Sequence, residues 1–259
     1  MIDWAYTLAG AFTGFVIGLT GVGGGALMTP ILLLFFGIAP TTAVATDLWF
    51  AAITKIAGAR IHHTNGNVDW QVVKRLWAGS LPMASLTVLL ISMGAHIVKI
   101  EWLTKGIGII VLITAAGLLV APKLIAFSKR KQIGQPERFE TMQAVLTVLA
   151  GAIIGVCVAL TSVGAGVLGS VMLLYLYPLR ITPHRLVATE IVHAIPLAII
   201  AGLGYLFAGM VDGAMLVSLL IGSIPAVIAG SKLASKIAGQ WIRFALAVVL
   251  AAAGLKVLL

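Results

Sequence analysis

The sequence predicts an all-α polytopic membrane protein built from two repeats, and three observations lead to this fold class. First, 61% of the 259 residues are hydrophobic, only 10% are charged, and the mean hydropathy is +1.12. Second, long apolar runs recur from end to end without the strict alternation of a membrane β-barrel. Third, short apolar segments interrupted by glycine lie at matching places in the two halves.

The second half of the chain repeats the first at a constant offset of 143 positions. Four separated places agree: Pro40 with Pro183, Ala45-Thr46-Asp47 with Ala188-Thr189-Glu190, Val68-Asp69 with Val211-Asp212, and Gly79-Ser80-Leu81-Pro82 with Gly222-Ser223-Ile224-Pro225. Agreement at one offset indicates a duplicated unit. We therefore expect a first transmembrane repeat at 1–121, a basic linker at 122–141 and a second transmembrane repeat at 142–259.

Each repeat is expected to hold about five helical elements. In the first repeat the apolar segments are Trp4–Leu19, Ala26–Ile38, Thr41–Ile56, Val72–Met93 and Leu103–Val120. Gln143–Leu160 and Val167–Tyr177 correspond to the first two of them. Pro30 is expected in the first turn of the second segment, where proline is well tolerated. Asp69 and Asp212 are expected to cap the helices that follow them.

The distribution of Lys and Arg indicates how the repeats are oriented. If each repeat has five elements and the linker is cytoplasmic, 14 of these residues lie on the cytoplasmic side and 3 lie outside. With four elements per repeat, the split falls to 10 against 7. Because cytoplasmic loops carry the excess of positive charge, we expect inverted repeats, with the N-terminus outside and linker 122–141 cytoplasmic. The count leaves open whether the glycine-joined segments cross fully or form re-entrant hairpins.

A glycine-rich stretch interrupts an apolar run in each repeat. The stretches are Thr20-Gly21-Val22-Gly23-Gly24-Gly25 and, 141 positions later, Thr161-Ser162-Val163-Gly164-Ala165-Gly166. The segments that flank the first stretch are shorter than the roughly 20 helical residues that cross a bilayer core. Glycine lets backbone approach a ligand closely, and helix N-termini offer unpaired N–H groups. The two stretches predict an anion-binding site without a buried Lys or Arg; the alternative is close helix packing.

Two acids, Asp47 and Glu190, occupy equivalent positions inside apolar segments. Intramembrane carboxylates usually line a cavity or a pathway, which suits proton coupling; a position near the membrane interface is the alternative. His193 lies three residues after Glu190 on the same helix face, so a proton relay between them is a hypothesis. A hydrogen-bonded structural histidine is the alternative there.

Four basic residues, Lys55, Arg60, His62 and His63, lie at the cytoplasmic end of the third segment and in the polar turn after it. They form a candidate vestibule that attracts anions. The simpler interpretation is that Lys55 extends to the interface and that the turn is solvated.

Nothing in the sequence indicates catalysis, a metal or a cofactor. The chain has no HExxH, Gly-x-Ser-x-Gly or phosphate-binding motif. Cys157 is the single cysteine, which excludes an intramolecular disulfide and a thiolate cluster. The net charge of +9 follows from Lys and Arg in cytoplasmic loops rather than from a nucleic-acid partner. The expected partners are a small anion and the lipid bilayer, with a homodimer left open.

These motifs resemble those of the TauE/SafE family of sulfite and organosulfonate exporters of bacterial inner membranes. The resemblance rests on the glycine-rich opening at 18–25 leading to Pro30, on Ala43-Val44-Ala45-Thr46, and on His62 and His63 followed by Gly66-Asn67-Val68-Asp69. The second half contains Gly164-Ala165-Gly166 and Leu186-Val187-Ala188-Thr189. The chain departs from the family pattern at Asp47 and Glu190, where a neutral polar residue is expected.

The resemblance implies a secondary transporter that exports sulfite, sulfoacetate or related organosulfonates across the bacterial plasma membrane. Alternating access would come from one half rocking against the other around the glycine site, and proton coupling is a further hypothesis. An anion channel, or a membrane subunit of a larger assembly without flux of its own, are the alternatives. The sequence leaves open which anion moves and in which direction.

Overall fold

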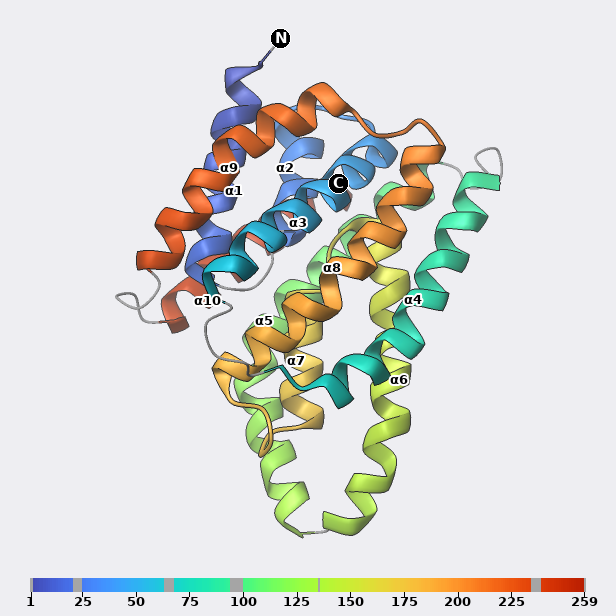
Figure 1. Cartoon of the computed structure of the whole chain (residues 1–259), viewed down its shortest axis with the longest axis vertical. Coiled ribbons are helices and arrows are strands. Elements are labelled where there is room, and N and C mark those ends of the chain that lie inside the picture. The colour runs from blue at the N-terminus through green and yellow to red at the C-terminus, as the bar shows by residue number, and fades with distance from the viewer. Residues whose placement is uncertain are drawn as a thin grey trace.

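A computed structural model of the chain describes residues 2–20, 25–62, 68–93, 100–134, 136–233 and 239–258. These ranges form ten α-helices and contain no strand (Figure 1). In chain order they are α1 (Trp4–Thr20), α2 (Gly25–Phe35), α3 (Pro40–His62), α4 (Trp70–Met93), α5 (Ile100–Gly134), α6 (Pro136–Thr161), α7 (Val167–Leu176), α8 (Pro183–Phe207), α9 (Gly213–Leu233) and α10 (Gly239–Leu258). The all-helical fold class is confirmed.

Length and composition qualify three stretches of described helix to cross a membrane, namely Met142–Thr161, Arg185–Phe207 and Gly213–Leu233. Three shorter apolar helical stretches accompany them: Trp4–Leu19, Thr104–Val120 and Ala247–Leu258. Helices α2 and α7, of 11 and 10 residues, are shorter than the roughly 20 residues that cross a bilayer core, as the glycine-interrupted segments predict.

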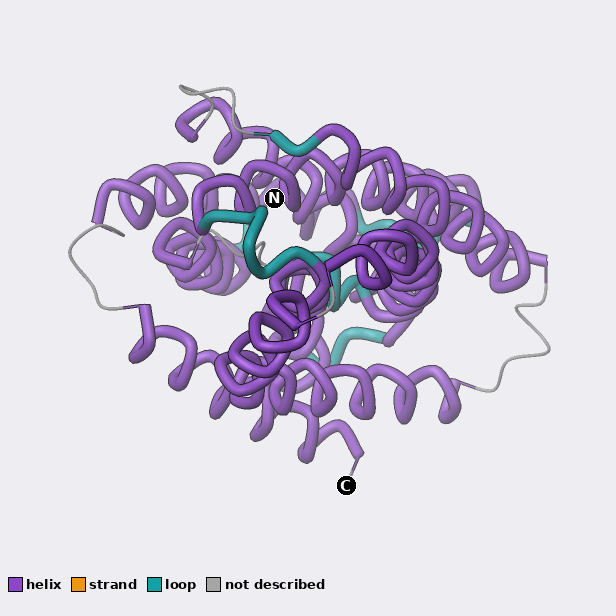
Figure 2. Tube along the Cα trace, turned by 90° about the horizontal axis from the view of Figure 1, so that it is seen from below, coloured by secondary structure: helices purple, strands orange, loops and turns teal. Residues whose placement is uncertain are grey.

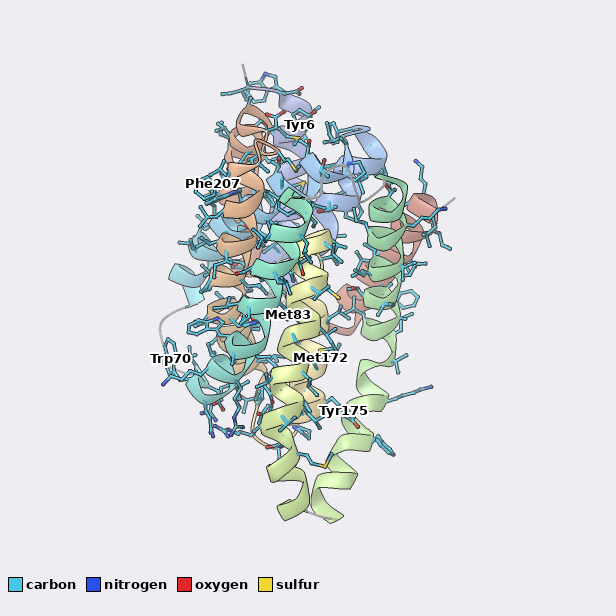
Figure 3. The ribbon with its side chains drawn as sticks, turned by 90° about the vertical axis from the view of Figure 1, so that its right-hand side faces the viewer. Tyr6, Trp70, Met83, Met172, Tyr175 and Phe207 are labelled. Carbon is cyan, nitrogen blue, oxygen red and sulfur yellow. The ribbon has the colours of Figure 1, made fainter. Side chains whose placement is uncertain are left out.

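The outer surface is apolar, as a lipid bilayer requires. Leu90 on α4 is 62% exposed and Val145 on α6 is 62% exposed, and large exposed apolar faces of this kind are not typical of water-soluble monomers. Aromatic side chains lie at separate levels along the long axis: Figure 3 shows Tyr6 and Phe207 in its upper part and Trp70 in its lower half. Aromatic residues favour the two membrane–water interfaces.

Two expected helix ends are wrong: α2 begins before Thr29-Pro30, and α3 continues beyond Ile56 to His62, so that Arg60 and His62 lie in a helix rather than in a polar turn. Helix α2 begins at Gly25, so Pro30 lies inside the helix rather than in its first turn. The linker at 122–141 is largely helical, because α5 continues to Gly134 and α6 begins at Pro136, a first position that proline tolerates. In Figure 1 these ends of α5 and α6 form a hairpin that projects at the bottom of the molecule.

The predicted helix caps are confirmed. The Asp69 carboxylate Oδ1 accepts a hydrogen bond from the backbone N–H of Val72 at 3.3 Å, at the start of α4. Asp212 Oδ1 does the same for the backbone N–H of Met215 at 2.9 Å, at the start of α9. Each aspartate thus accepts from an N–H group that the helix itself leaves unpaired.

The two sequence halves are interleaved rather than packed as separate bodies. Helix α1 packs most extensively along α9, and α6 packs most extensively along α4. Both pairs join one half to the other, and they are related by the repeat. Figure 1 shows α1 beside α9 at the upper left, while Figure 2 shows the helices from below. A rocking motion of one sequence half against the other would have to open both of these interfaces, and this expected motion stays a prediction.

Glycines allow these helix pairs to approach at backbone contact distance. A Cβ atom on Gly222 of α9 would overlap the carbonyl oxygen of Thr7 on α1, and one on Gly79 of α4 would overlap that of Val148 on α6. Gly79 and Gly222 are equivalent positions of the repeat. Small residues at interfaces are a common means of close packing between membrane helices. Close helix packing, which was the alternative role for the glycine-rich stretches, is thus the role of Gly79 and Gly222.

Candidate functional site

The break between α6 and α7 shapes the second glycine-rich stretch. Helix α6 ends at Thr161, and the next residues include Ser162 with φ of 58° and Gly164 with φ of 121°. The Thr161 hydroxyl donates to the Cys157 carbonyl at 2.7 Å and accepts from the Val163 N–H at 3.1 Å. Only glycine adopts such a conformation as that of Gly164 without strain. The chain therefore turns sharply inside the protein before α7 begins.

This turn presents backbone donors at the start of α7. The Gly164 carbonyl accepts from the Gly169 N–H at 3.0 Å. Among the described residues, the N–H groups of Gly164, Ala165 and Gly166 donate to no acceptor. Unpaired N–H groups at a helix start carry positive partial charge and favour anions.

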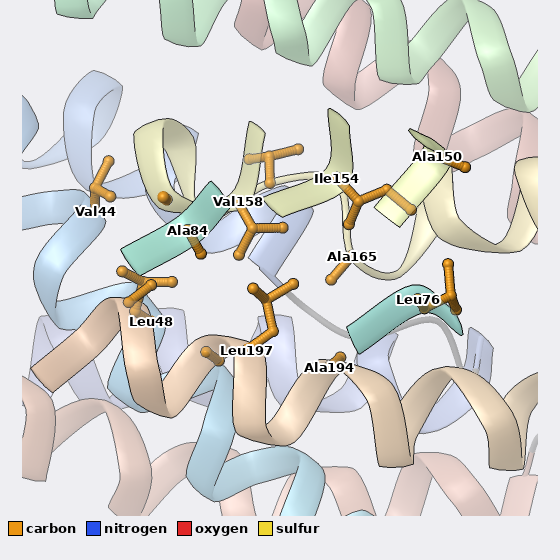
Figure 4. Packing of buried hydrophobic residues seen from close by; sticks show 14 of the residues in the cluster. Val44, Leu48, Leu76, Ala84, Ala150, Ile154, Val158, Ala165, Ala194 and Leu197 are labelled. Carbon is orange, nitrogen blue, oxygen red and sulfur yellow. The ribbon is translucent and has the colours of Figure 1, made fainter. Parts of the chain in front are cut away.

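A small cavity lies between this turn, α3 and α8. Its volume is about 10 Å³, close to the space that one water molecule needs. The turn contributes Ser162, Gly164, Ala165 and Gly166, α3 contributes Ala51 and Lys55, and α8 contributes Ala194 and Ala198. Figure 4 shows Ala165 of the turn in the same packed cluster as Val158 and Ala194.

Two pairs of repeat-equivalent positions line the cavity; the residues match in one pair and differ in the other. Ala51 and Ala194 are equivalent by the offset of 143, and Lys55 is equivalent to Ala198. Helices α3 and α8, which are equivalent elements, pack against each other. Lys55 therefore distinguishes the cavity-lining face of α3 from the equivalent face of α8.

Lys55 is buried and paired with Glu190. Its Nζ lies 2.7 Å from Glu190 Oε1, and the two side chains are 4% and 2% exposed. Neither the interfacial position considered for Lys55 nor that considered for Glu190 is correct, and the expectation of a site without a buried Lys is also wrong. A buried ion pair persists because each charge stabilises the other where water is absent. The second carboxylate oxygen of Glu190 is buried and has no partner among the described residues.

Asp47 occupies the equivalent position in the first repeat but has different partners. Its Oδ2 accepts from the Thr29 hydroxyl at 2.6 Å and from the Thr29 backbone N–H at 3.1 Å. The side chain is fully buried, so Asp47 also lies inside the protein rather than at the interface. Asp47 thus places a carboxylate beside the first turns of α2, where a ligand anion was expected.

His193 contacts α4 and not Glu190. Its Nε2 lies 2.9 Å from the Ser80 hydroxyl, and its backbone carbonyl accepts from the Trp77 indole N–H at 3.2 Å. Within the described chain no contact joins the His193 ring to Glu190. The geometry therefore matches the structural alternative, in which the histidine is held by a hydrogen bond.

A reciprocal pair of hydrogen bonds joins the two repeats next to these acids. The Asp69 N–H donates to the Thr189 hydroxyl at 3.1 Å, and the Asp212 N–H donates to the Thr46 hydroxyl at 3.2 Å. The sequence analysis did not assign a role to either threonine. Their place directly before the two acids, in both copies, was the available signal.

An ion pair closes one end of this region. Arg180, which precedes α8, reaches Asp69 with Nε to Oδ2 at 2.7 Å and with a terminal nitrogen to Oδ1 at 2.8 Å. Such a two-point contact is the strong form of an arginine–carboxylate pair. It also links the halves, since Asp69 begins α4.

The comparison with known proteins matches the chain to the family described as "Sulfite exporter TauE/SafE" over residues 6–257. The chain belongs to the TauE/SafE family. Its relatives include the probable membrane transporter protein YjnA of Bacillus subtilis (strain 168), which is 35% identical over 97% of this chain and 98% of its own length. The probable membrane transporter protein YdhB of the same organism is 26% identical over 95% and 96%. No solved structure matches the chain.

Family membership makes the chain a membrane transporter rather than an enzyme. For this TauE/SafE protein the structure describes the second glycine-rich stretch but not the first. Gly21, Val22, Gly23, Gly24 and His63 lie outside the described residues, and Thr20, Gly25, Arg60 and His62 lie in helices without described side chains. Their roles in binding or in a vestibule stay predictions. Within the described ranges no three His, Cys, Asp or Glu side chains gather as a metal site would require.

Proposed function

We propose that this transporter carries small sulfur oxyanions, such as sulfite or an organosulfonate, outward across the bacterial plasma membrane, and that it binds them at the α6–α7 turn. One observation carries the proposal: Lys55 lines the same small cavity as Gly164, Ala165 and Gly166, whose backbone N–H groups have no acceptor in the described part of the chain. An oxyanion accepts several hydrogen bonds at once, and both kinds of donor meet there.

The donors suit reversible binding. An ammonium group has three N–H donors, and the described chain places one acceptor, Glu190 Oε1, against that of Lys55. Because Glu190 balances the Lys55 charge, the empty site is close to neutral, and a neutral site does not hold an anion irreversibly. A carrier needs such moderate binding in order to release its substrate.

The cavity is smaller than a sulfite ion, so substrate entry requires helix movement. We infer that the moving groups follow the helix pairs rather than the sequence halves. Helix α1 would stay with α9 and α4 with α6, since glycine-mediated backbone contacts join each pair. The contact between α3 and α8, which borders the cavity, would then change between the two access states.

The proposal is tested by flux into proteoliposomes that contain only this chain. Flux of sulfite, thiosulfate, sulfoacetate, taurine and methanesulfonate would be compared with that of chloride. Vesicles with the protein inserted in each of the two orientations would establish the direction of transport. Saturable flux of a sulfur anion, with counterflow, is the expected result. Currents far above carrier turnover would indicate a channel instead, and no flux from folded protein would indicate a subunit of a larger assembly.

A matched pair of variants tests the position of the site. Ala165→Leu places a large side chain in the cavity and is expected to abolish flux. Gly106→Ala on α5 is the control, because a Cβ there meets no atom within 4 Å. Full flux in Ala165→Leu would remove the α6–α7 turn from the binding site.

A further inference from the structure

We propose that Glu190 competes with the substrate anion for Lys55, so that each anion crosses the membrane together with one proton. This inference rests on the proposed function and adds the coupling ion and its mechanism. The substrate would take the place of the Glu190 carboxylate on the Lys55 ammonium group, and Glu190 would accept a proton from the aqueous side.

The geometry places the exchanging groups at one point. Lys55 Nζ contacts Glu190 Oε1 at 2.7 Å on one side and lines the cavity on the other. Ser162, which lines the same cavity, interacts with the Asp47 carboxylate. Once helix movement admits an anion to the cavity, the anion would meet Lys55 beside the turn.

Charge balance explains why the proton must follow the anion. In the empty state, Lys55 is cationic and Glu190 anionic, so the pair has no net charge. Adding a monovalent anion alone would leave one uncompensated negative charge in the membrane interior, where such charges are expensive. Protonation of the Glu190 carboxylate restores neutrality, and release of both the anion and the proton on the far side restores the ion pair. No covalent bond forms or breaks except the carboxyl O–H.

The surrounding groups leave Lys55 as the charged partner of Glu190. Helices α3, α4, α6 and α7 pack against α8. The titratable side chains that these helices and the residues next to them bring to this interior are Lys55, Asp47, Asp69, Arg75, Cys157, Tyr175, Tyr177, His193 and Tyr205. In the described chain Asp47 bonds Thr29, Asp69 pairs with Arg180, and Arg75 bonds Tyr177. His193 bonds Ser80, one turn along α8 from Glu190. Lys55 alone among them contacts the Glu190 carboxylate.

The test separates two kinds of transport in proteoliposomes, with methanesulfonate as the probe because its single charge does not change with pH. One assay measures exchange of labelled for unlabelled methanesulfonate without a pH gradient. The other measures accumulation driven by a pH gradient, with an internal pH dye to follow proton movement. The unmodified protein is expected to do both, to move one proton per anion, and to be insensitive to membrane potential.

Glu190→Gln is expected to retain exchange, to lose accumulation down to the level of protein-free vesicles, and to become sensitive to membrane potential. Asp47→Asn, at the equivalent position, is expected to keep accumulation, because Asp47 bonds Thr29 and does not form the ion pair with Lys55. Accumulation retained in Glu190→Gln, or anion movement without protons in the unmodified protein, would overturn the inference while leaving the transport function intact.

Folding is controlled separately. The double variant Lys55→Met/Glu190→Gln removes both charges together and is expected to fold but to lose exchange as well as accumulation. If it still exchanges methanesulfonate, Lys55 is not the binding charge and the inference fails. If the unmodified protein neither exchanges nor accumulates any sulfur anion, the proposed function itself fails.

Discussion

The two buried acids occupy equivalent positions in the repeats, yet their surroundings differ. Glu190 pairs with an ammonium group at 2.7 Å, whereas Asp47 accepts from a hydroxyl and an amide of Thr29. Position 55 is one source of the difference, since the residue that matches Lys55 in the second repeat is Ala198. The two repeats share a frame, but the residues around the two acids differ.

This comparison indicates how one site arises from two copies. In the first repeat the protein's own carboxylate lies against the backbone near the start of α2. In the second repeat the start of α7 holds N–H groups that have no acceptor in the described chain, and their residues line a cavity. A helix start that already holds an acid does not attract a second anion. The substrate role therefore falls to the second repeat in our proposal.

Removal of Lys55 is expected to have the largest effect. In Lys55→Met the buried Glu190 loses its partner, and breaking a buried ion pair in this way destabilises a protein by about 3–5 kcal/mol. Thermal unfolding of the purified protein in detergent measures the change. Lys123→Met, which removes an exposed lysine of α5, is the control. An unfolding temperature equal to that of the control would show that the pair is unimportant for stability.

Enlargement of the interfacial glycines is expected to have a large effect that is equal in the two repeats. Gly79→Leu and Gly222→Leu each force a side chain against a backbone carbonyl, and overpacking costs about 1–3 kcal/mol or more. Unfolding temperatures of both variants would be compared with that of Gly213→Leu, where a Cβ meets no atom within 4 Å. Unlike the acids, these two positions should behave alike. A clear difference between them would mean that the two interfaces are not equivalent.

The smallest effect concerns two equivalent serines. Ser80 bonds His193 at 2.9 Å, while the buried hydroxyl of Ser223 has no partner in the described chain. Ser80→Ala should destabilise the protein by about 1 kcal/mol, the net value of an ordinary hydrogen bond, and Ser223→Ala should be neutral or slightly stabilising. Parallel unfolding curves decide the matter. The reverse order would show that the His193 bond contributes nothing.

Much of the fold could be predicted because its signals are local. Apolar runs mark the helices, and the Asp69 and Asp212 caps follow from their position before an apolar run. The helix ends were harder to predict. Pro30 looked like a first-turn proline, and the polar residues from 122 to 141 looked like a separate linker, although α5 and α6 extend through them. Polar composition does not end a helix that leaves the apolar core.

The site was predicted less completely, because its charges find partners far away in the sequence. The Thr161–Gly166 stretch, Asp47 and Glu190 stood out as unusual residues in apolar segments. The relay between Glu190 and His193 relied on helix spacing alone, and the His193 ring instead contacts Ser80 on another helix. Helix spacing indicates which side chains point in the same direction. It does not indicate which residues of other helices those side chains contact.

The sequence by itself determined that this is a helical membrane protein with a duplicated plan, because hydrophobicity and repetition are properties of the chain. Only the tertiary structure decided that α1 packs with α9 and α4 with α6, and that Lys55 meets Glu190, 135 residues away. The physical reason is that a lysine near a helix end can either reach water or pair with a buried acid. Which of the two happens depends on the helix that packs over the lysine. Here α8 packs against α3 and places Glu190 next to Lys55.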